Sequence, residues 1–191
     1  MVREIIIWPD PRLREKAKDV RPGDAQVRKL VEDMFETMYA ASGVGLAAPQ
    51  VGVLQRVIVI DTSPRQESAK SVALINPVLV RTEGETVYNE GCLSIPGESE
   101  EVVRAEKAWV RAFDRDGNPF TIDAAEGLLA IALQHEIDHL DGTLFVDHLS
   151  ALKRELIKRR MKRLKAEREE EKRTGKKPKP KPESERELPA L

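Results

Sequence analysis

The sequence is poor in the residues that most often carry metal or redox chemistry, because its 191 residues include one cysteine and three histidines. A single cysteine excludes an internal disulfide, so Cys92 is a buried apolar residue, a reactive thiol or a metal ligand. Long apolar runs are also missing. The run from Ile5 to Trp8 ends at Pro9 and Asp10, which makes it too short for a signal peptide or a membrane span. We therefore expect a cytoplasmic protein with no membrane partner.

Charge is divided unevenly along the chain, although the formal net charge is only -1. Residues 151–191 hold 16 Lys and Arg against 8 Asp and Glu, which leaves 16 against 25 for residues 1–150. An acidic body does not suit a nucleic-acid-binding surface, whereas a basic tail commonly attracts an anionic partner such as RNA. The other interpretation of the tail is a solvated helix that only aids solubility, and the sequence leaves both open.

Helical and strand patterns follow one another without strict alternation, which predicts an α+β fold. Asp24 is an N-cap candidate for a helix of about 18 residues. Gly43–Gln50 is too rich in small residues to continue this helix and is expected to form a loop. Strands are expected at Arg56–Ile60, at Val72–Val80 with an interruption at Asn76-Pro77, at Val102-Val103 and at Ala108–Phe113, with a hairpin turn at Asp114–Asn118. Further helices are expected over Ala124–Leu140 and Ser150–Arg173. We expect one domain over residues 1–150, a basic helix over 151–173 and a disordered Lys/Pro-rich tail over 174–191.

The sharpest local signal is His135-Glu136-Ile137-Asp138-His139, which lies inside the second expected helix. Residues four apart share one side of a helix, so His135 and His139 can present two imidazoles to one metal ion. Glu136 would lie beside that ion as a general acid/base. The alternative is a pair of ordinary helical histidines, but the apolar residues one and two turns earlier direct this side of the helix toward the core.

Cys92 could supply a third ligand, because it lies in a glycine-containing segment outside any evident apolar stripe. Three protein ligands leave a fourth position for water, as in a catalytic metal site, whereas a structural zinc site closes with four. His148 could be that fourth ligand, but we interpret it as a surface histidine. The predicted site is therefore catalytic.

Three ordered segments resemble the motifs of peptide deformylases: Gly43–Gln50 (GVGLAAPQ), Glu90–Ser94 (EGCLS) and Gln134–His139 (QHEIDH). The resemblance extends over about residues 3–150. It implies mostly antiparallel strands packed around a central buried helix that carries the HExxH motif, plus a C-terminal helix. It also implies a hydrolase that removes the formyl group from the N-terminal formyl-methionine of newly synthesised polypeptides. One divalent metal ion is implied, with iron(II) expected and zinc, nickel or cobalt possible in a purified sample.

The resemblance also implies roles for individual residues. A metal-activated water attacks the formyl carbon, with Glu136 as general base and then acid. The Gln50 amide and the Leu93 N–H stabilise the oxyanion, and Gly45 lets the substrate backbone approach closely. The methionine side chain is expected to lie among Val44, Tyr88, Leu128, Ile131 and Ala132.

Two further expectations concern the segment around the cysteine. Glu90 and Arg104 are expected to form an ion pair that orients the cysteine loop. Gly97–Glu101 departs from some bacterial members, because an acidic, small-residue stretch replaces a basic residue that contacts the peptide there. The substrate affinity beyond the first residues is therefore an open question.

The nascent formyl-methionine polypeptide is the expected substrate, and the basic C-terminal helix could bind ribosomal RNA. Two other interpretations compete with this one. The first is an aminopeptidase that uses the same HExxH chemistry on free amines. The second is an RNA-associated binding protein whose metal is structural, for which Glu136→Gln would change no activity.

Overall fold

The computed structural model describes residues 1–63 and 71–175. Its strands are β1 (Gly45–Ala47), β2 (Val57–Asp61), β3 (Ser71–Glu83), β4 (Thr86–Gly91), β5 (Ser99–Arg104), β6 (Lys107–Phe113) and β7 (Pro119–Ala125). Its α-helices are α1 (Ala25–Ala40), α2 (Gly127–Leu140) and α3 (Ala151–Thr174), with short 3-10 helices η1 (Pro11–Arg14), η2 (Ala48–Val51) and η4 (Phe145–His148). The expected tail falls largely on residues 176–191, outside the described residues.

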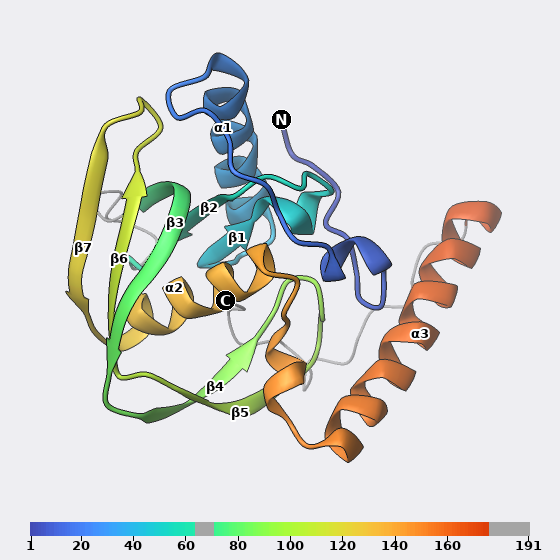
Figure 1. Ribbon diagram of the computed structural model, residues 1–191. Helices are drawn as coiled ribbons and strands as arrows, with labels where there is room; N and C mark the ends of the chain where they lie inside the picture. Colours follow the sequence, from blue (N-terminus) through green and yellow to red (C-terminus); the bar gives the residue numbers. More distant parts are fainter. Residues whose placement is uncertain (64–70, 176–191) are drawn as a thin grey trace.

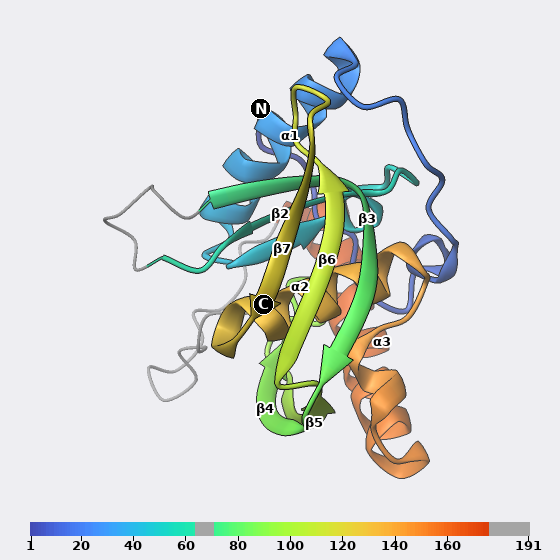
Figure 2. The same ribbon diagram turned by 60° about the vertical axis from the view of Figure 1, so that its left-hand side comes forward.

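Two antiparallel sheets surround the central helix α2, as Figures 1 and 2 show. The larger sheet has the strand order β1-β2-β3-β6-β7, and β4 pairs with β5 in a separate two-stranded sheet. Every pairing between these strands is antiparallel. This arrangement confirms the predicted α+β class, with a central helix carrying the HExxH motif and a C-terminal helix.

Strand β2 is covered on both faces, which explains its unbroken apolar sequence. Ile58 and Ile60 pack in the core cluster that contains α2, whereas Val57 and Val59 pack in the cluster that contains α1. Side chains of a strand alternate between its two faces, so this division follows directly from the strand geometry. The larger sheet is therefore a layer between α1 and α2.

Helix α1 begins where the sequence predicts, because the Asp24 side chain accepts a hydrogen bond from Gln26 N at 2.7 Å. Its buried apolar face consists of Val27, Leu30, Val31, Met34 and Met38. The expected interruption in β3 is also present, as a register shift between Ile75 and Val78. Asn76 has a positive φ of 50° at that point.

The structure differs from the sequence prediction in three places. Helix α2 begins at Gly127 and not at Ala124, because β7 continues to Ala125, which pairs with Ala108 of β6. The small-residue segment Gly43–Gln50, expected to be a loop, contains the short strand β1 and part of η2. Strand β4 was not predicted. Strand pairing determines all three features, through β6 with β7, β1 with β2 and β4 with β5, and the pattern of one segment does not contain that information.

Helix α3 follows Ser150, whose side chain accepts from Lys153 N, and it lies along one side of the molecule (Figure 1). Ile157 and Met161 are its buried residues, and both belong to a core cluster that also contains Cys92, Ile95 and the N-terminal Trp8. Within the described residues, none of the helices has the length and apolar character that a membrane crossing needs.

Candidate active site

Three buried side chains meet between α2 and the loop after β4. The possible ligand atoms of Cys92, His135 and His139 all lie within 4.8 Å of one another. His135 and His139 are one helical turn apart on α2, and Cys92 Sγ is 3.3 Å from His139 Nε2. Each of the three residues is at most 2% exposed. The structure thus brings together the three residues that the sequence analysis paired with a metal.

The polar atoms at this point lack the partners that buried groups normally have. Within the described part of the chain, His135 Nε2, His139 Nδ1 and both carboxylate oxygens of Glu136 are buried without a hydrogen-bond partner. Buried polar groups without partners are rare and costly, and a metal ion or a bound substrate commonly accounts for them. A thiolate and two imidazoles with a carboxylate alongside form a donor set that fits a divalent transition metal.

Glu136 lies inside the protein with no exposed surface. Burial disfavours the charged carboxylate and raises the pKa of Glu136 to about 7. A pKa near the working pH suits a group that must both accept and release a proton. Gly45 makes this position possible, because a Cβ there would overlap Glu136 Oε1 and lie 3.0 Å from its Cδ.

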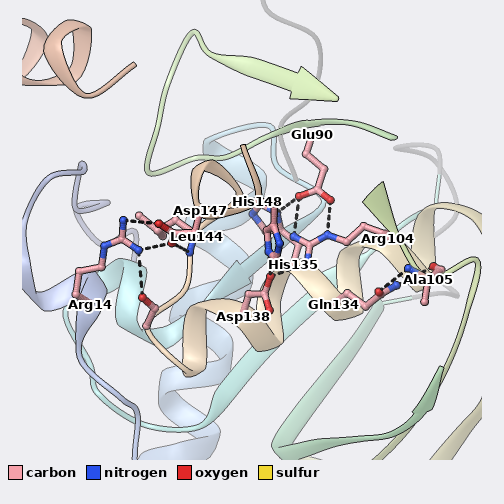
Figure 3. A network of polar contacts seen from close by, with 11 residues as sticks. Arg14, Glu90, Arg104, Ala105, Gln134, His135, Asp138, Leu144, Asp147 and His148 are labelled. Atoms are coloured by element: carbon pink, nitrogen blue, oxygen red, sulfur yellow. Dashed lines mark hydrogen bonds and ion pairs between the residues drawn. The ribbon is translucent and has the colours of Figure 1, made fainter. Parts of the chain in front are cut away.

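A chain of charged groups contacts His135 at Nδ1, the ring nitrogen other than the unpartnered Nε2 (Figure 3). His135 Nδ1 is 2.8 Å from Glu90 Oε2, and Arg104 donates to both Glu90 oxygens, from Nε at 2.6 Å and from Nη2 at 3.0 Å. Burial acts to raise the pKa of Glu90, but hydrogen bonds from His135 and Arg104 outweigh it and lower the pKa to about 2. Glu90 is therefore an ionised acceptor, which leaves His135 Nε2 free to face the metal site.

The same chain continues to the surface through two residues to which the sequence analysis gave no supporting role. Arg104 Nη1 donates to Asp138 Oδ2 at 2.6 Å, and His148 Nε2 is 2.9 Å from that same oxygen. His148 is 36% exposed and lies outside the Cys-His-His cluster, as a surface histidine would. Asp138 lies three residues after His135, and this position within the motif is the sequence feature that could have indicated its supporting role.

The Gln50 side chain lies against the cysteine loop. Its Oε1 accepts from Ala47 N at 2.7 Å, and its Nε2 points toward Cys92 Sγ at 3.5 Å and Ser94 Oγ at 3.3 Å. The loop itself is closed by a hydrogen bond from Ile95 N to Cys92 O at 2.9 Å, with Leu93 inside the turn. The Gln50 amide and the turn that contains Leu93, which are the expected oxyanion donors, therefore lie beside Cys92.

The residues expected around the methionine side chain fall into two groups. Ile131 and Ala132 are buried in the α2 cluster, and Val44 and Leu128 are half-buried against it. Tyr88 lies on β4, is 37% exposed and is outside that cluster. Four of the five residues thus share one apolar environment beside His135.

Comparison with known proteins connects this geometry to one family. A family model described as polypeptide deformylase matches residues 2–155. A peptide deformylase of Alkalilimnicola ehrlichii is 53% identical over 164 residues, which is 85% of this chain and 90% of that protein. A crystal structure of a peptide deformylase from Legionella pneumophila superposes with a TM-score of 0.82 at 48% identity, covering 93% of this chain and 100% of that one. A peptide deformylase from Ehrlichia chaffeensis in complex with actinonin has a TM-score of 0.80 at 41% identity, covering 85% and 96%.

Proposed function

The chain belongs to the polypeptide deformylase family, a family of metal-dependent hydrolases, and we propose that Cys92, His135 and His139 hold its metal while Glu136 moves the proton. The observation that carries this proposal is the set of buried, unpartnered atoms around Cys92, namely His135 Nε2 and both Glu136 oxygens. The reaction adds water to the formyl carbon and breaks the bond to the terminal nitrogen. Its products are formate and a free amine.

The metal site fits iron(II), and we propose iron(II) as the resident ion. Two imidazoles and a thiolate also suit zinc, cobalt or nickel, so the ion found in a purified sample depends on what is available. When bound, the ion supplies Lewis-acid chemistry, because it lowers the pKa of water and polarises a carbonyl. Glu90 and Arg104 hold His135 in the orientation that this site needs.

Glu136 acts first as a base and then as an acid. Its carboxylate takes a proton from the attacking water, and the same proton then passes to the leaving amine nitrogen. Burial raises the pKa of Glu136, which favours its acceptance of a proton from water. Gly45 keeps the carboxylate in place by leaving room that a side chain would occupy.

Gln50 Nε2 and the Leu93 N–H stabilise the negative charge that develops on the formyl oxygen. Gln50 suits this role because its Oε1 is already held by Ala47 N, which fixes the direction of the amide. The hydrogen bond from Ile95 N to Cys92 O similarly fixes the turn that presents Leu93. Preorganised donors of this kind contribute about 3 to 4 kcal/mol each to lowering a barrier.

The substrate peptide is proposed to pair with β1, which is an edge strand of the larger sheet. Gly45 would be close to the scissile group, next to Glu136. The methionine side chain would lie against Val44, Leu128, Ile131 and Ala132, with Tyr88 near its entrance. An apolar lining of this type suits an unbranched thioether side chain.

We assign catalysis to residues 1–150, a basic partner-binding helix to residues 151–173 and a Lys/Pro-rich tail to residues 174–191. The expected partner of the helix is ribosomal RNA, and the expected location is the cytoplasm, where newly synthesised chains emerge. Arg159 and Lys162 are exposed on the side of α3 away from the buried Ile157 and Met161. That outward face is the candidate RNA surface.

The catalytic proposal is tested with formyl-Met-Ala-Ser and its unformylated counterpart Met-Ala-Ser. We expect formate from the first peptide and no cleavage of the second. Release of free methionine from Met-Ala-Ser without formate from the other peptide would support the aminopeptidase alternative.

The RNA proposal is tested by ribosome co-sedimentation of the wild type and Arg159→Glu/Lys162→Glu at two salt concentrations. Substitutions are preferable to a truncation at residue 150, because a truncated chain would lose the buried Ile157 and Met161 from the core around Cys92. We expect the variant to pellet less, and salt to reduce pelleting of the wild type. Equal pelleting of the two proteins would contradict the proposal.

A further inference from the structure

The acidic segment after the cysteine loop faces helix α3. Arg160 donates to both carboxylate oxygens of Glu98, from Nε at 2.6 Å and from Nη2 at 2.5 Å. Lys153 Nζ is 2.6 Å from Glu100 Oε2. Lys153 and Arg160 are seven residues apart, so they lie on the same side of the helix. Two acidic residues of the segment Gly97–Glu101 thus form ion pairs with α3.

The connection from Glu98 back to Cys92 is short and internally bonded. Glu98 N donates to Ile95 O at 3.3 Å, and Ile95 N donates to Cys92 O at 2.9 Å. Ser94 O accepts from Trp8 N at 2.9 Å, which ties the middle of the turn to the N-terminal segment. Two backbone hydrogen bonds through Ile95 therefore connect Glu98 to Cys92, and a displacement of Glu98 should also move Cys92.

Apolar packing links the same side of α3 to the same loop. Ile157 has no exposed surface and Met161 is 3% exposed, and both lie in one cluster with Cys92 and Ile95. Along the helix, Lys153 precedes this contact by one turn, and Arg160 lies within it, next to Met161. The orientation of α3 and the position of the loop are thus determined together.

The second ion pair is also close to His135, through Glu90. Glu100 is directly opposite Glu90 in the pairing of β4 with β5, and Glu90 is 2.8 Å from His135 Nδ1. Glu98 is only 13% exposed and Glu100 25% exposed, so both carboxylates are partly withdrawn from water. Partly buried ion pairs are screened less by salt than fully exposed ones.

We propose that Lys153 and Arg160 are positioning residues of the active site, which act by holding Glu98 and Glu100 so that the loop with Cys92 and Leu93 keeps its place beside α2. The proposal rests on the proposed function for the roles of Cys92 and Leu93. In this proposal the acidic segment Gly97–Glu101 holds α3 against the rest of the domain. Lys153 and Arg160 face this segment, whereas Arg159 and Lys162 face outward.

The test is a charge swap in the full chain loaded with cobalt(II). The variants are Arg160→Glu, Glu98→Arg and the double variant, with Arg115→Glu as the control that makes the same charge change in the exposed turn between β6 and β7. The readouts are kcat and KM for formyl-Met-Ala-Ser, the visible absorption of the bound cobalt(II), and the rate of cobalt loss to a chelator.

We expect each inward single variant to lower kcat/KM by about two- to fivefold, the range expected when a partly exposed ion pair is lost. Each should also shift the cobalt absorption and release cobalt faster. The double variant should recover the wild-type values, and Arg115→Glu should match the wild type throughout. If Arg160→Glu does not fold, Arg160→Gln and Arg115→Gln make the same comparison.

Identical cobalt spectra and loss rates for Arg160→Glu and Arg115→Glu would overturn the proposal. So would a double variant whose defect equals the sum of the two single defects. Failure of the proposed function is separable from both, because a wild type that releases no formate still yields the cobalt spectra of every variant.

Discussion

Replacing Glu136 with Gln should stabilise the metal-free protein, although it removes the proposed acid/base group. Both carboxylate oxygens are buried without a hydrogen-bond partner among the described residues, and burial raises the pKa of Glu136 to about 7 from an ordinary value of 4.5. The folded protein therefore binds this proton more tightly than the unfolded chain does. The ionised carboxylate is the unfavourable form, and an amide of the same shape avoids it.

The sign and the size follow from linkage between proton binding and folding. Because the folded-state pKa is the higher one, Glu136 favours the folded state below pH 4.5, and that contribution is lost as the pH rises toward 7. A difference of about 2.5 pKa units corresponds to about 3 kcal/mol, at 1.36 kcal/mol per unit. The Gln variant has no such proton, so its unfolding free energy lacks this pH dependence.

The assay is urea denaturation of both proteins after chelation under reducing conditions, at pH 5 and at pH 8. The other titrating groups are shared by the two proteins, and His135 is the group whose pKa Glu136 itself raises. The unfolding free energy of the variant relative to the wild type should increase by about 2 to 3 kcal/mol from pH 5 to pH 8. The same difference at both pH values would show that Glu136 titrates as an ordinary exposed carboxyl, which would refute the reasoning.

Three further changes have defined outcomes. Arg104→Met leaves His135 as the remaining charged-group contact of the buried Glu90, and urea denaturation should show that the free energy of unfolding falls by about 3 to 5 kcal/mol. A decrease in this free energy below about 1 kcal/mol would contradict the prediction. Gly45→Ala places a Cβ against the Glu136 carboxylate, and a displacement of about 1 Å should lower kcat about 100-fold with unchanged metal content; an unchanged kcat would show that the carboxylate has room. Chelation should abolish formate release and added cobalt(II) or nickel(II) should restore it, whereas activity that survives complete metal removal would exclude the metal-dependent mechanism.

Local patterns were sufficient for the features that depend on one element. The His135 and His139 spacing on a helix, the Asp24 cap and the apolar face of α1 require only helical periodicity, and the structure contains each of them. Cys92 joins the histidines through the tertiary fold, so its assignment needed the resemblance as well as its odd local context. The three deformylase motifs meet at one place because β1, the cysteine loop and α2 are neighbours in space.

Features that depend on pairing or contact between separate segments were not predictable. The late start of α2 follows from the continued pairing of β7 with β6, and Ala124 and Gly127 have positive φ values of 49° and 58° where the chain turns into the helix. The contacts of Asp138 with Arg104 and with His148 similarly depend on how β5 lies against α2 and η4. The ion pair of Glu98 with Arg160 joins residues 62 positions apart, and no local pattern indicates it.

The most direct test of the central claim is formate release from formyl-Met-Ala-Ser by anaerobically purified protein, compared between the wild type and Glu136→Gln with metal counted by elemental analysis in both. Both proteins should hold about one metal ion per chain, because Glu136 is not a ligand, and the wild type alone should release formate. Formate release by Glu136→Gln at the wild-type rate, with the metal still bound, would contradict the assignment of Glu136 as the group that moves the proton.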